Sequence, residues 1–372
     1  MSTGFGIYVH TPWCRVRCPY CAFNVFLSDT ADYSRWEATV LAGWAATSDA
    51  FEGHAHSLYF GGGTPSLAPP AVIGRLIDAM PLMSDAEVTL EANPGQLDPT
   101  TLKSLIRSGV NRLSVGVQTF NQAHARRLGR GHTVEQTREL LRRIPSMDLC
   151  SWSADLIFAL PDQTLDELEA DLDDLLEARP PHVSLYGLTI EPGTPFAERA
   201  RQGKLALPAG ELWGEMYARI VERLGEAGLE RYEVSNFAIP GHRAVHNEQV
   251  WRGGHYAGLG PGAHGFLPSG DRTLGHAQLD AWYNDPVPTI ESPTPEEAAL
   301  DMLLSTLRHV DGVSLQALQT ETAFTLDPEI LRDLAARHLI DEVAHHIRLT
   351  PGAYPVADGV VRRMADALIP MD

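Results

Sequence analysis

Short apolar runs rich in β-branched residues alternate with longer amphipathic stretches through the first half of the chain. The short runs predict strands over residues 6–11, 57–60, 87–92, 112–117, 150–158 and 182–190. The amphipathic stretches predict helices over residues 31–48, 70–80, 99–107, 133–144 and 164–178. This alternation is typical of repeated β-α units, so we expect an α/β fold in the form of a partial (β/α)6 barrel. The functional loops of such barrels follow the carboxyl ends of the strands.

The second half of the chain is less regular. A helix pair over 198–228 and a strand over 231–238 are expected, followed by a Gly-rich stretch at 252–265. The Pro-rich segment 286–295 is typical of a linker. Beyond it we expect helices at 296–308, 314–320, 328–337 and 359–368, with a β-ribbon formed by 346–350 and 354–358. The predicted parts are a barrel (1–235), a connecting region (236–290) and a smaller C-terminal helical domain (291–372).

Composition narrows the possible functions. With 372 residues, of which 44% are hydrophobic, the chain can build a large core and exceeds the usual single-domain size. Its formal net charge of -19 argues against nucleic-acid binding, which relies on Lys and Arg at phosphates. There is no run of about 20 apolar residues, and the start M-S-T-G-F-G-I-Y has no basic region of a signal peptide. We therefore expect a cytoplasmic protein without a transmembrane segment.

Three of the four cysteines lie within eight positions. Cys14, Cys18 and Cys21 form a C-x3-C-x2-C pattern, whereas Cys150 stands alone. Thiolates this close together favour zinc, copper(I) or an iron–sulfur cluster. A structural zinc site needs a fourth ligand. The remaining alternative is a loop of three cysteines that binds no metal. On a [4Fe-4S] cluster three cysteines leave one iron open, and S-adenosylmethionine (SAM) can chelate that iron. With this pattern the stretch resembles the signature of the radical SAM superfamily.

Polar and glycine residues follow several predicted strands. Gly61, Gly62 and Gly63 precede Thr64 and could form an ordinary tight turn or let a ligand approach the backbone closely. Taken alone, Glu91 is equally explained as a helix cap, and Gln118, Arg130 and Asp155 are equally explained as solvated polar residues. Their shared placement at strand ends predicts a common cleft.

Several further segments resemble the group of radical SAM proteins that contains the coproporphyrinogen III dehydrogenases and the heme chaperones. They are Y-V-H-T-P-W-C, G-G-G-T-P-S, E-A-N-P, G-V-N-R-L-S-V-G-V-Q, F-A-L-P-D-Q-T, L-T-I-E-P-G-T and G-L-G-P-G-A-H. The resemblance implies that the cluster-bound SAM is lined by Tyr8, Gly62, Glu91 and Ala263. It implies that a second SAM, whose binding here is open, would be lined by Tyr20, Gly63, Thr64, Gln118, Arg130, Asp155 and Gly187. It also implies a winged-helix-like C-terminal domain, acting as a lid or docking surface.

Three features favour the chaperone branch of the group. Phe23 stands where the dehydrogenases carry a fourth cysteine, few residues precede Tyr8, and H-N-E-Q-V-W at 246–251 is close to the H-N-x-x-Y-W motif of the heme chaperones. By this resemblance His246 ligates heme iron, Trp251 stacks on the macrocycle, and Asn247 bonds a ring or orients the imidazole. Alternatively, His246 is an ordinary loop histidine. Candidates for a second axial ligand are His242, His255 and His264, and Val250 replaces the motif's Tyr.

The resemblance implies a heme chaperone that binds a [4Fe-4S] cluster, SAM and heme and passes heme to an acceptor hemoprotein, with a possible peripheral contact at a membrane. A flavodoxin or ferredoxin would supply electrons. One alternative is an oxygen-independent coproporphyrinogen III oxidase; another is a different radical SAM reaction on a tetrapyrrole. No catalytic residue is assigned.

Overall fold

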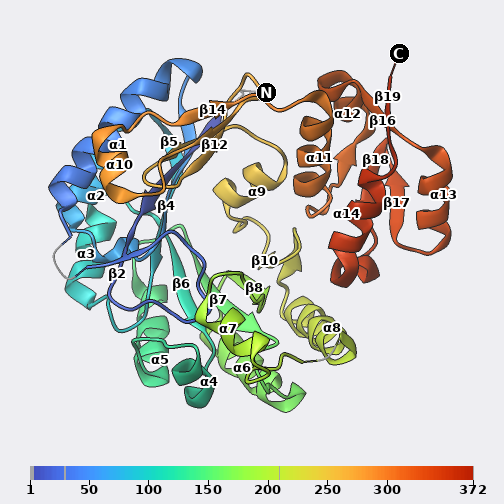
Figure 1. Cartoon of the computed structure of the whole chain (residues 1–372). Helices are drawn as coiled ribbons and strands as arrows, with labels where there is room; N and C mark the ends of the chain where they lie inside the picture. The colour runs from blue at the N-terminus through green and yellow to red at the C-terminus, as the bar shows by residue number, and fades with distance from the viewer. Residues whose placement is uncertain (1–3, 29–30, 209, 372) are drawn as a thin grey trace.

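The computed structural model describes residues 4–28, 31–208 and 210–371. Residues 1–3 of the expected N-terminal segment, residue 209 of the expected helix pair and the terminal residue 372 lie outside this description. A twelve-stranded sheet dominates the fold, in the order β14-β13-β12-β11-β1-β4-β5-β6-β7-β8-β10-β9. Figure 1 shows this sheet curving through the larger part of the molecule, with the C-terminal elements beside it.

The six predicted β-α units are confirmed. Their strands pair in parallel in chain order, and their apolar, β-branched side chains are buried on both faces, as parallel sheets require. The bounds are β1 Phe5–Thr11, β4 Ala55–Gly62, β5 Leu82–Ala92, β6 Arg112–Gln118, β7 Ser151–Phe158 and β8 His182–Gly187.

Helices cover the outer face of these strands, on the left and lower sides in Figure 1. Thr133 and Thr164 each close a capping box with the residue three positions on, which sets where two of these helices begin. The helices are α1 Tyr33–Thr47, α2 Pro70–Ala79, α3 Pro99–Arg107, α4 Gln122–Arg127, α5 Val134–Arg143 and α6 Leu165–Ala178; short 3-10 turns lie at Ser48–Ala50, Pro65–Leu67 and Ile144–Ser146.

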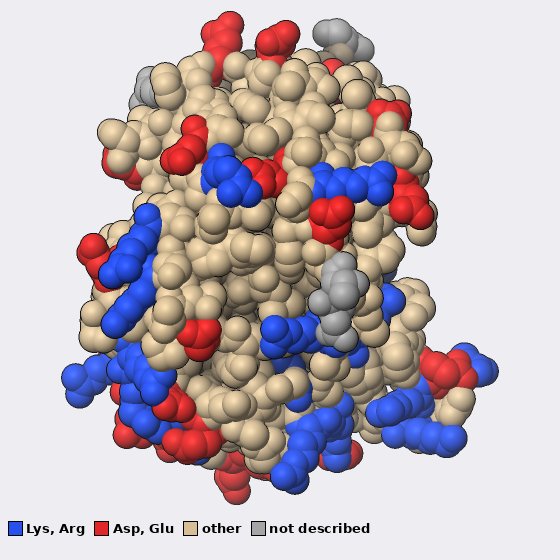
Figure 2. All heavy atoms as spheres, turned by 90° about the vertical axis from the view of Figure 1, so that its left-hand side faces the viewer, with Lys and Arg blue, Asp and Glu red and all other residues tan. Residues whose placement is uncertain are grey.

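Charges of both signs alternate on the helical side of the molecule, as Figure 2 shows. Arg75 pairs with Glu37 at 2.6 Å, and Arg142 pairs with Glu135 at 2.9 Å. Pairs of this kind at the surface add little to stability, because solvent screens the charges. Despite the net charge of -19, this face of the molecule is therefore neither uniformly acidic nor uniformly basic.

The predicted helix pair corresponds to α7 Pro195–Arg201 and α8 Gly210–Glu226. The single strand expected over 231–238 is wrong, because the run divides into β9 Glu230–Arg231 and β10 Asn236–Ala238. Between them the Ser235 amide donates to the Glu233 carboxylate at 3.1 Å, which turns the chain so that β10 pairs antiparallel with both β8 and β9.

The connecting region extends the sheet on its other edge. β11 lies parallel to β1, and the later strands follow it antiparallel. The Pro-rich segment expected to be a linker contains β14, which pairs with β13, so it belongs to the sheet in part. The elements are α9 Val245–Trp251, β11 Tyr256–Leu259, β12 His264–Phe266, β13 Arg272–Leu274, α10 Leu279–Asn284 and β14 Thr289–Glu291.

The C-terminal segment places helices around a three-stranded sheet of order β15-β18-β17. The expected ribbon is wrong: β18 pairs with β17, and residues 351–356 form a 3-10 helix. Pro351 and Pro355 cannot donate to a strand ladder, while Ala344 and His345 adopt positive φ and turn β17 into β18. The elements are α11 Pro295–Thr306, β15 Val313–Ser314, α12 Leu315–Thr322, β16 Phe324–Leu326, α13 Pro328–Ala336, β17 Ile340–Val343, β18 His346–Leu349, α14 Ala357–Ala365 and β19 Leu368–Pro370.

One cluster of buried apolar side chains runs from the barrel strands into the C-terminal helices, from Leu58 and Leu113 to Leu303 and Val360. Within the described ranges no helix is both long and apolar enough to cross a membrane.

Candidate metal and cofactor site

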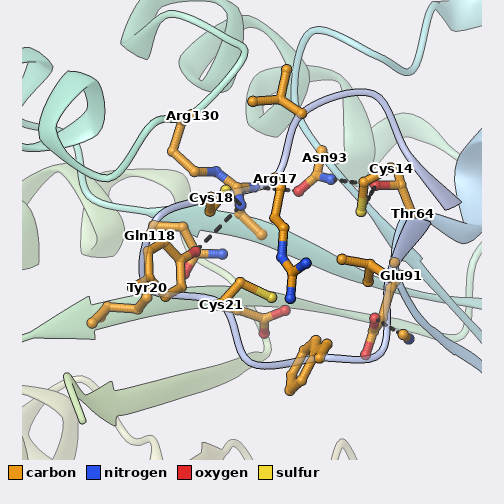
Figure 3. Close-up of a pocket in the computed structure, with 18 of the residues that line it drawn as sticks. Cys14, Arg17, Cys18, Tyr20, Cys21, Thr64, Glu91, Asn93, Gln118 and Arg130 are labelled. Carbon is orange, nitrogen blue, oxygen red and sulfur yellow. Dashed lines mark hydrogen bonds between the residues drawn. The ribbon is translucent and has the colours of Figure 1, made fainter. Parts of the chain in front are cut away.

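The cysteine loop lies at the carboxyl end of β1. Strand β2 (Trp13–Cys14) pairs with β3 (Phe26–Leu27) and closes the base of the loop. Within it the Cys21 amide donates to the Cys18 carbonyl at 3.1 Å, which forms a tight turn. All three cysteines line one cavity of about 510 Å³, and Figure 3 shows their sulfur atoms on its wall.

The surroundings of the thiols act on them in opposite directions. Burial raises the pKa values of Cys14 and Cys21. Against this, Arg17 lies beside Cys21 (Figure 3) and lowers that pKa, and Arg130 donates to Cys18 Sγ at 3.7 Å. Cationic neighbours favour the thiolate, which is the form that binds metals. An iron–sulfur cluster would deprotonate these thiols outright.

The donor set suits an iron–sulfur cluster with an open site. Among the described residues no three His, Cys, Asp or Glu side chains are arranged to hold a single metal ion, although three thiols face one cavity. Cys150 is exposed and donates to Asn111 Oδ1 at 3.7 Å, away from the cavity. His132 also lines the cavity, but among the described residues it is not grouped with the thiols in a way that would hold a single metal ion.

The glycine run brings the backbone of β4 against the cysteine loop. Gly62 has φ of +105°, and a Cβ atom there would lie 2.5 Å from the His10 ring. A Cβ atom on Gly63 would lie 2.5 Å from the Trp13 carbonyl oxygen. A larger residue at Gly62 would collide with His10 of β1, and one at Gly63 would push the start of the cysteine loop away from β4, so the run is more than an ordinary turn.

Glu91 stands at the end of β5 with both carboxylate oxygens bonded. Tyr59 Oη donates to Oε1 at 2.9 Å, and the Gly62 amide donates to Oε2 at 3.1 Å. Burial raises the pKa of Glu91 to about 7, against the effect of the Tyr59 hydrogen bond. This buried carboxyl group can accept hydroxyl donors from a ligand.

Arg130 forms hydrogen bonds to several groups in the wall of the first cavity. Its guanidinium donates to the Gly116 carbonyl at 2.9 Å, to Asn93 Oδ1, and to Tyr20 Oη at 3.4 Å. Asn93 in turn donates to Thr64 Oγ1 at 3.1 Å (Figure 3). The Arg130 Nε atom is buried with no hydrogen-bond partner in the described chain. A planar guanidinium in this position suits an anionic group such as a carboxylate.

The predicted common cleft is confirmed in its geometry. Asp155 accepts hydrogen bonds from Ser114 Oγ at 2.6 Å and Ser153 Oγ at 2.5 Å, and burial raises its pKa. Gln118 adopts φ of +68° at an irregularity in the pairing of β6 with β7. The cavity lining includes the three cysteines and Tyr20, Gly62, Gly63, Thr64, Glu91, Gln118, Arg130, Asp155 and Gly187. Their roles toward SAM stay predictions.

A second cavity, of about 490 Å³, adjoins the first. Tyr8 and Ala263, predicted beside the cluster-bound SAM, line this second cavity and not the first. The α9 residues His246, Asn247 and Trp251 line it as well. Both cavities share a wall made of Phe23, Tyr59, Gly62, Glu91 and Tyr186.

His246 is held in a defined orientation. Its Nδ1 lies 3.0 Å from Ser57 Oγ, and its ring lies 5.2 Å from that of Tyr59. Burial lowers the pKa of His246 to about 3, so the imidazole is neutral. Among the described residues Nε2 has no hydrogen-bond partner, and in the tautomer whose Nδ1 donates to Ser57 Oγ the Nε2 lone pair is available to a ligand in the second cavity.

Glu87 was missed by the sequence interpretation. Its carboxylate accepts the Val245 and His246 amides at 3.0 and 3.2 Å, and this supplies acceptors for the first turn of α9. Arg112 lies 3.6 Å from it and is almost fully buried. The available signal was a charged residue at the start of each of two apolar strand runs, since buried charges are normally paired.

Comparison with known proteins identifies the family of this chain. The model of the radical SAM superfamily matches residues 8–175. The heme chaperone HemW of Escherichia coli (strain K12) is 38% identical over 267 residues, covering 70% of this chain and 69% of that protein. The heme chaperone HemW of Bacillus subtilis (strain 168) is 32% identical over 361 residues, covering 92% of this chain and 94% of that protein.

A third relative is the mitochondrial radical S-adenosyl methionine domain-containing protein 1 of Danio rerio, 39% identical over 276 residues. The match covers 71% of this chain but only 61% of that protein, less than two thirds of its length. Among solved structures, coproporphyrinogen III oxidase (HemN) from Escherichia coli has a TM-score of 0.82, covers 98% of this chain and 90% of its own, and is 21% identical, which shows the shared fold. The chain therefore belongs to the radical SAM superfamily, in the group of the HemW heme chaperones and the radical S-adenosyl methionine domain-containing proteins 1.

Proposed function

We propose that this protein binds heme as cargo in the second cavity and passes it to an acceptor hemoprotein in the cytoplasm. The observation that carries the proposal is His246, a neutral imidazole whose Nδ1 is engaged by Ser57 and whose Nε2 is free on the cavity wall. Neutral imidazole is the usual protein ligand of heme iron. A hydrogen bond at the other ring nitrogen typically orients such a ligand.

The rest of the second cavity suits a flat, largely apolar cargo. Trp251 offers an aromatic face, and Val250 and Phe23 add apolar surface, with Phe23 61% exposed. Asn247 supplies an amide for a polar edge of the ligand. The names of the relatives agree with heme handling, because two of them are called heme chaperones.

The first cavity would hold the cofactors that the family implies. Cys14, Cys18 and Cys21 would bind the [4Fe-4S] cluster, and Glu91 would accept the ribose hydroxyls of SAM. Arg130 would face an anionic group of a bound SAM. When loaded, the cluster supplies the electron that cleaves the SAM sulfonium. A flavodoxin or ferredoxin is the proposed reductant.

Heme release would depend on the part of the chain beyond residue 291, which we propose as a separate domain. Glu248 of α9 pairs with Arg243 at 2.9 Å and lies 3.5 Å from His309 in that part. A movement there would therefore move α9 and the heme site. One proposed acceptor is a membrane-associated respiratory enzyme, which this protein would contact peripherally at the membrane. The proposal includes no nucleic-acid partner, given the net charge of -19.

A second candidate function is oxygen-independent coproporphyrinogen III oxidation, which the fold shared with HemN favours. It would need hydrogen abstraction from two propionate side chains and release of carbon dioxide. Phe23 disfavours it, since it stands at the position of the fourth cysteine of that branch.

The experiment that tests the proposal is anaerobic reconstitution with iron and sulfide, followed by incubation with heme or with coproporphyrinogen III in the presence of SAM and reductant. We expect one heme bound per chain and no protoporphyrinogen. Turnover of coproporphyrinogen would establish the oxidase instead.

The matching variant is His246→Ala. It should weaken heme binding by about tenfold to 100-fold, because even partners that only orient a ligand cost that much. His242→Ala is the control, since His242 bonds Ser151 Oγ at 3.0 Å and lines neither cavity. An equal effect of both variants would contradict the assignment.

A further inference from the structure

Three histidines line the second cavity, and they differ in what their ring nitrogens contact. His10 is fully engaged, with Nδ1 3.0 Å from Tyr8 Oη and Nε2 2.8 Å from the Asn24 carbonyl oxygen. His246 has one nitrogen engaged and one free. His264 is exposed, and neither of its ring nitrogens has a hydrogen-bond partner within the described part of the chain. Two imidazoles of this cavity can therefore still bind a ligand.

The backbone that carries His264 is firmly placed. His264 begins β12 and pairs with Leu274 of β13. On its other side the backbone of β11 approaches so closely that a Cβ atom on Gly258 would lie 1.9 Å from the His264 carbonyl oxygen. The preceding turn is closed by the Ala263 amide, which donates to the Gly260 carbonyl at 3.2 Å. His264 thus combines a fixed main chain with a side chain free to reorient.

Other lining groups are poor alternatives for iron. Tyr8 and Tyr59 use their hydroxyl groups on His10 and Glu91. Burial raises the pKa of Tyr256, which disfavours its phenolate. Val250 and Phe23 carry no donor atom. Of the remaining donors, a neutral imidazole is the one heme iron takes most often.

We propose that His264 is the second axial ligand of the bound heme, opposite His246. This inference rests on the proposed function. The iron would be six-coordinate, held by imidazoles from α9 and from β12, which lie far apart in the sequence. The buried His246 would keep its bond while the exposed His264 exchanges first. In that exchange the bond from iron to His264 breaks and a bond from iron to a ligand of the acceptor forms, with no change in the oxidation state of iron.

The test is a hemin titration of the full chain, followed by absorption and electron paramagnetic resonance spectra of ferric heme. The parent protein should give a low-spin, six-coordinate spectrum. His264→Ala should still bind one heme but give a high-spin spectrum, and added imidazole should restore the low-spin state. It should also lose heme faster to apomyoglobin, a generic acceptor.

His255→Ala is the matched control, because His255 is a neighbouring histidine that does not line the cavity; it should keep the low-spin spectrum. A low-spin spectrum in His264→Ala, or a high-spin spectrum in the parent protein, would overturn the inference and leave heme binding in place. Absence of saturable heme binding by the parent protein would instead overturn the proposed function.

Discussion

The two cavities are nearly equal in size, about 510 and 490 Å³, but they are built in different ways. The first combines three thiols, Arg130 and Glu91, which follow strand ends or lie in the loops beyond them. Besides the shared wall, the second takes its aromatic and imidazole groups from α9, β1, β11 and β12. The same fold therefore contains two kinds of site. One is built at the ends of the repeated β-α units, and the other is built where additional elements pack against those units.

The shared wall connects the two sites physically. Tyr59 donates its hydroxyl hydrogen to Glu91 on one side, and its ring packs against His246 on the other. A ligand that displaces Glu91 would change the position of Tyr59 and thus the support of His246. Coupling between sites requires such a group with contacts to both.

Cys18→Ser should give the largest difference between the two cavities, because it should affect bound iron and not heme binding. Losing one of three cluster thiolates should reduce bound iron after reconstitution from about four per chain to near zero, while heme still binds in the second cavity. Iron and sulfide analysis with a parallel heme titration measures both. Cys150→Ser is the control and should keep its iron; full iron retention by Cys18→Ser would remove the cluster assignment.

Glu248→Gln should lower the stability of the protein and weaken the second cavity while leaving the first cavity unchanged. His309, Arg243 and Arg252 lower the pKa of Glu248 to about 2, below the value of an unfolded Glu. Its stabilising effect is therefore complete above about pH 4.5 and disappears as the pH falls toward 2. Urea unfolding should show a loss of about 1–2 kcal/mol at pH 7 that shrinks at pH 3.

The matched control for this variant is Glu329→Gln, whose side chain is 85% exposed and pairs only loosely with Arg332 at 3.7 Å. Glu248→Gln should weaken heme binding and leave iron content unchanged. An equal loss of stability at pH 3 and pH 7 would contradict the ionic contribution.

Tyr59→Phe should give the smallest effect and test the shared wall. The ring that packs on His246 stays, while the hydrogen bond to Glu91 is lost, at a cost of about 0.5–1.5 kcal/mol. SAM affinity of the reconstituted protein should fall roughly 2–10-fold, with heme affinity nearly unchanged.

The pH dependence of SAM affinity provides a second test of Tyr59→Phe. In the parent protein SAM affinity should rise through pH 7, because Glu91 has a pKa of about 7 and accepts hydroxyl donors best when ionised. Since the Tyr59 hydrogen bond lowers that pKa, the rise should move to higher pH in Tyr59→Phe. Calorimetry over pH 6–8 measures it, and an unmoved profile would exclude Glu91 as the titrating group.

The sequence by itself determined the barrel and part of the lining of the first cavity. Alternating strands and helices imply parallel pairing, and parallel strands end at one edge of a sheet, so residues that follow them, such as Glu91 and Gln118, must meet. The cysteine spacing placed three thiols on one loop for the same local reason.

Only the tertiary structure decided the second cavity. Tyr8 and Ala263 face it because β11 pairs with β1 across about 250 positions of chain, and His246 points into it because Ser57 and Glu87 hold α9 in place. Long-range contacts carry no period or spacing along the chain, and therefore no local pattern announces them.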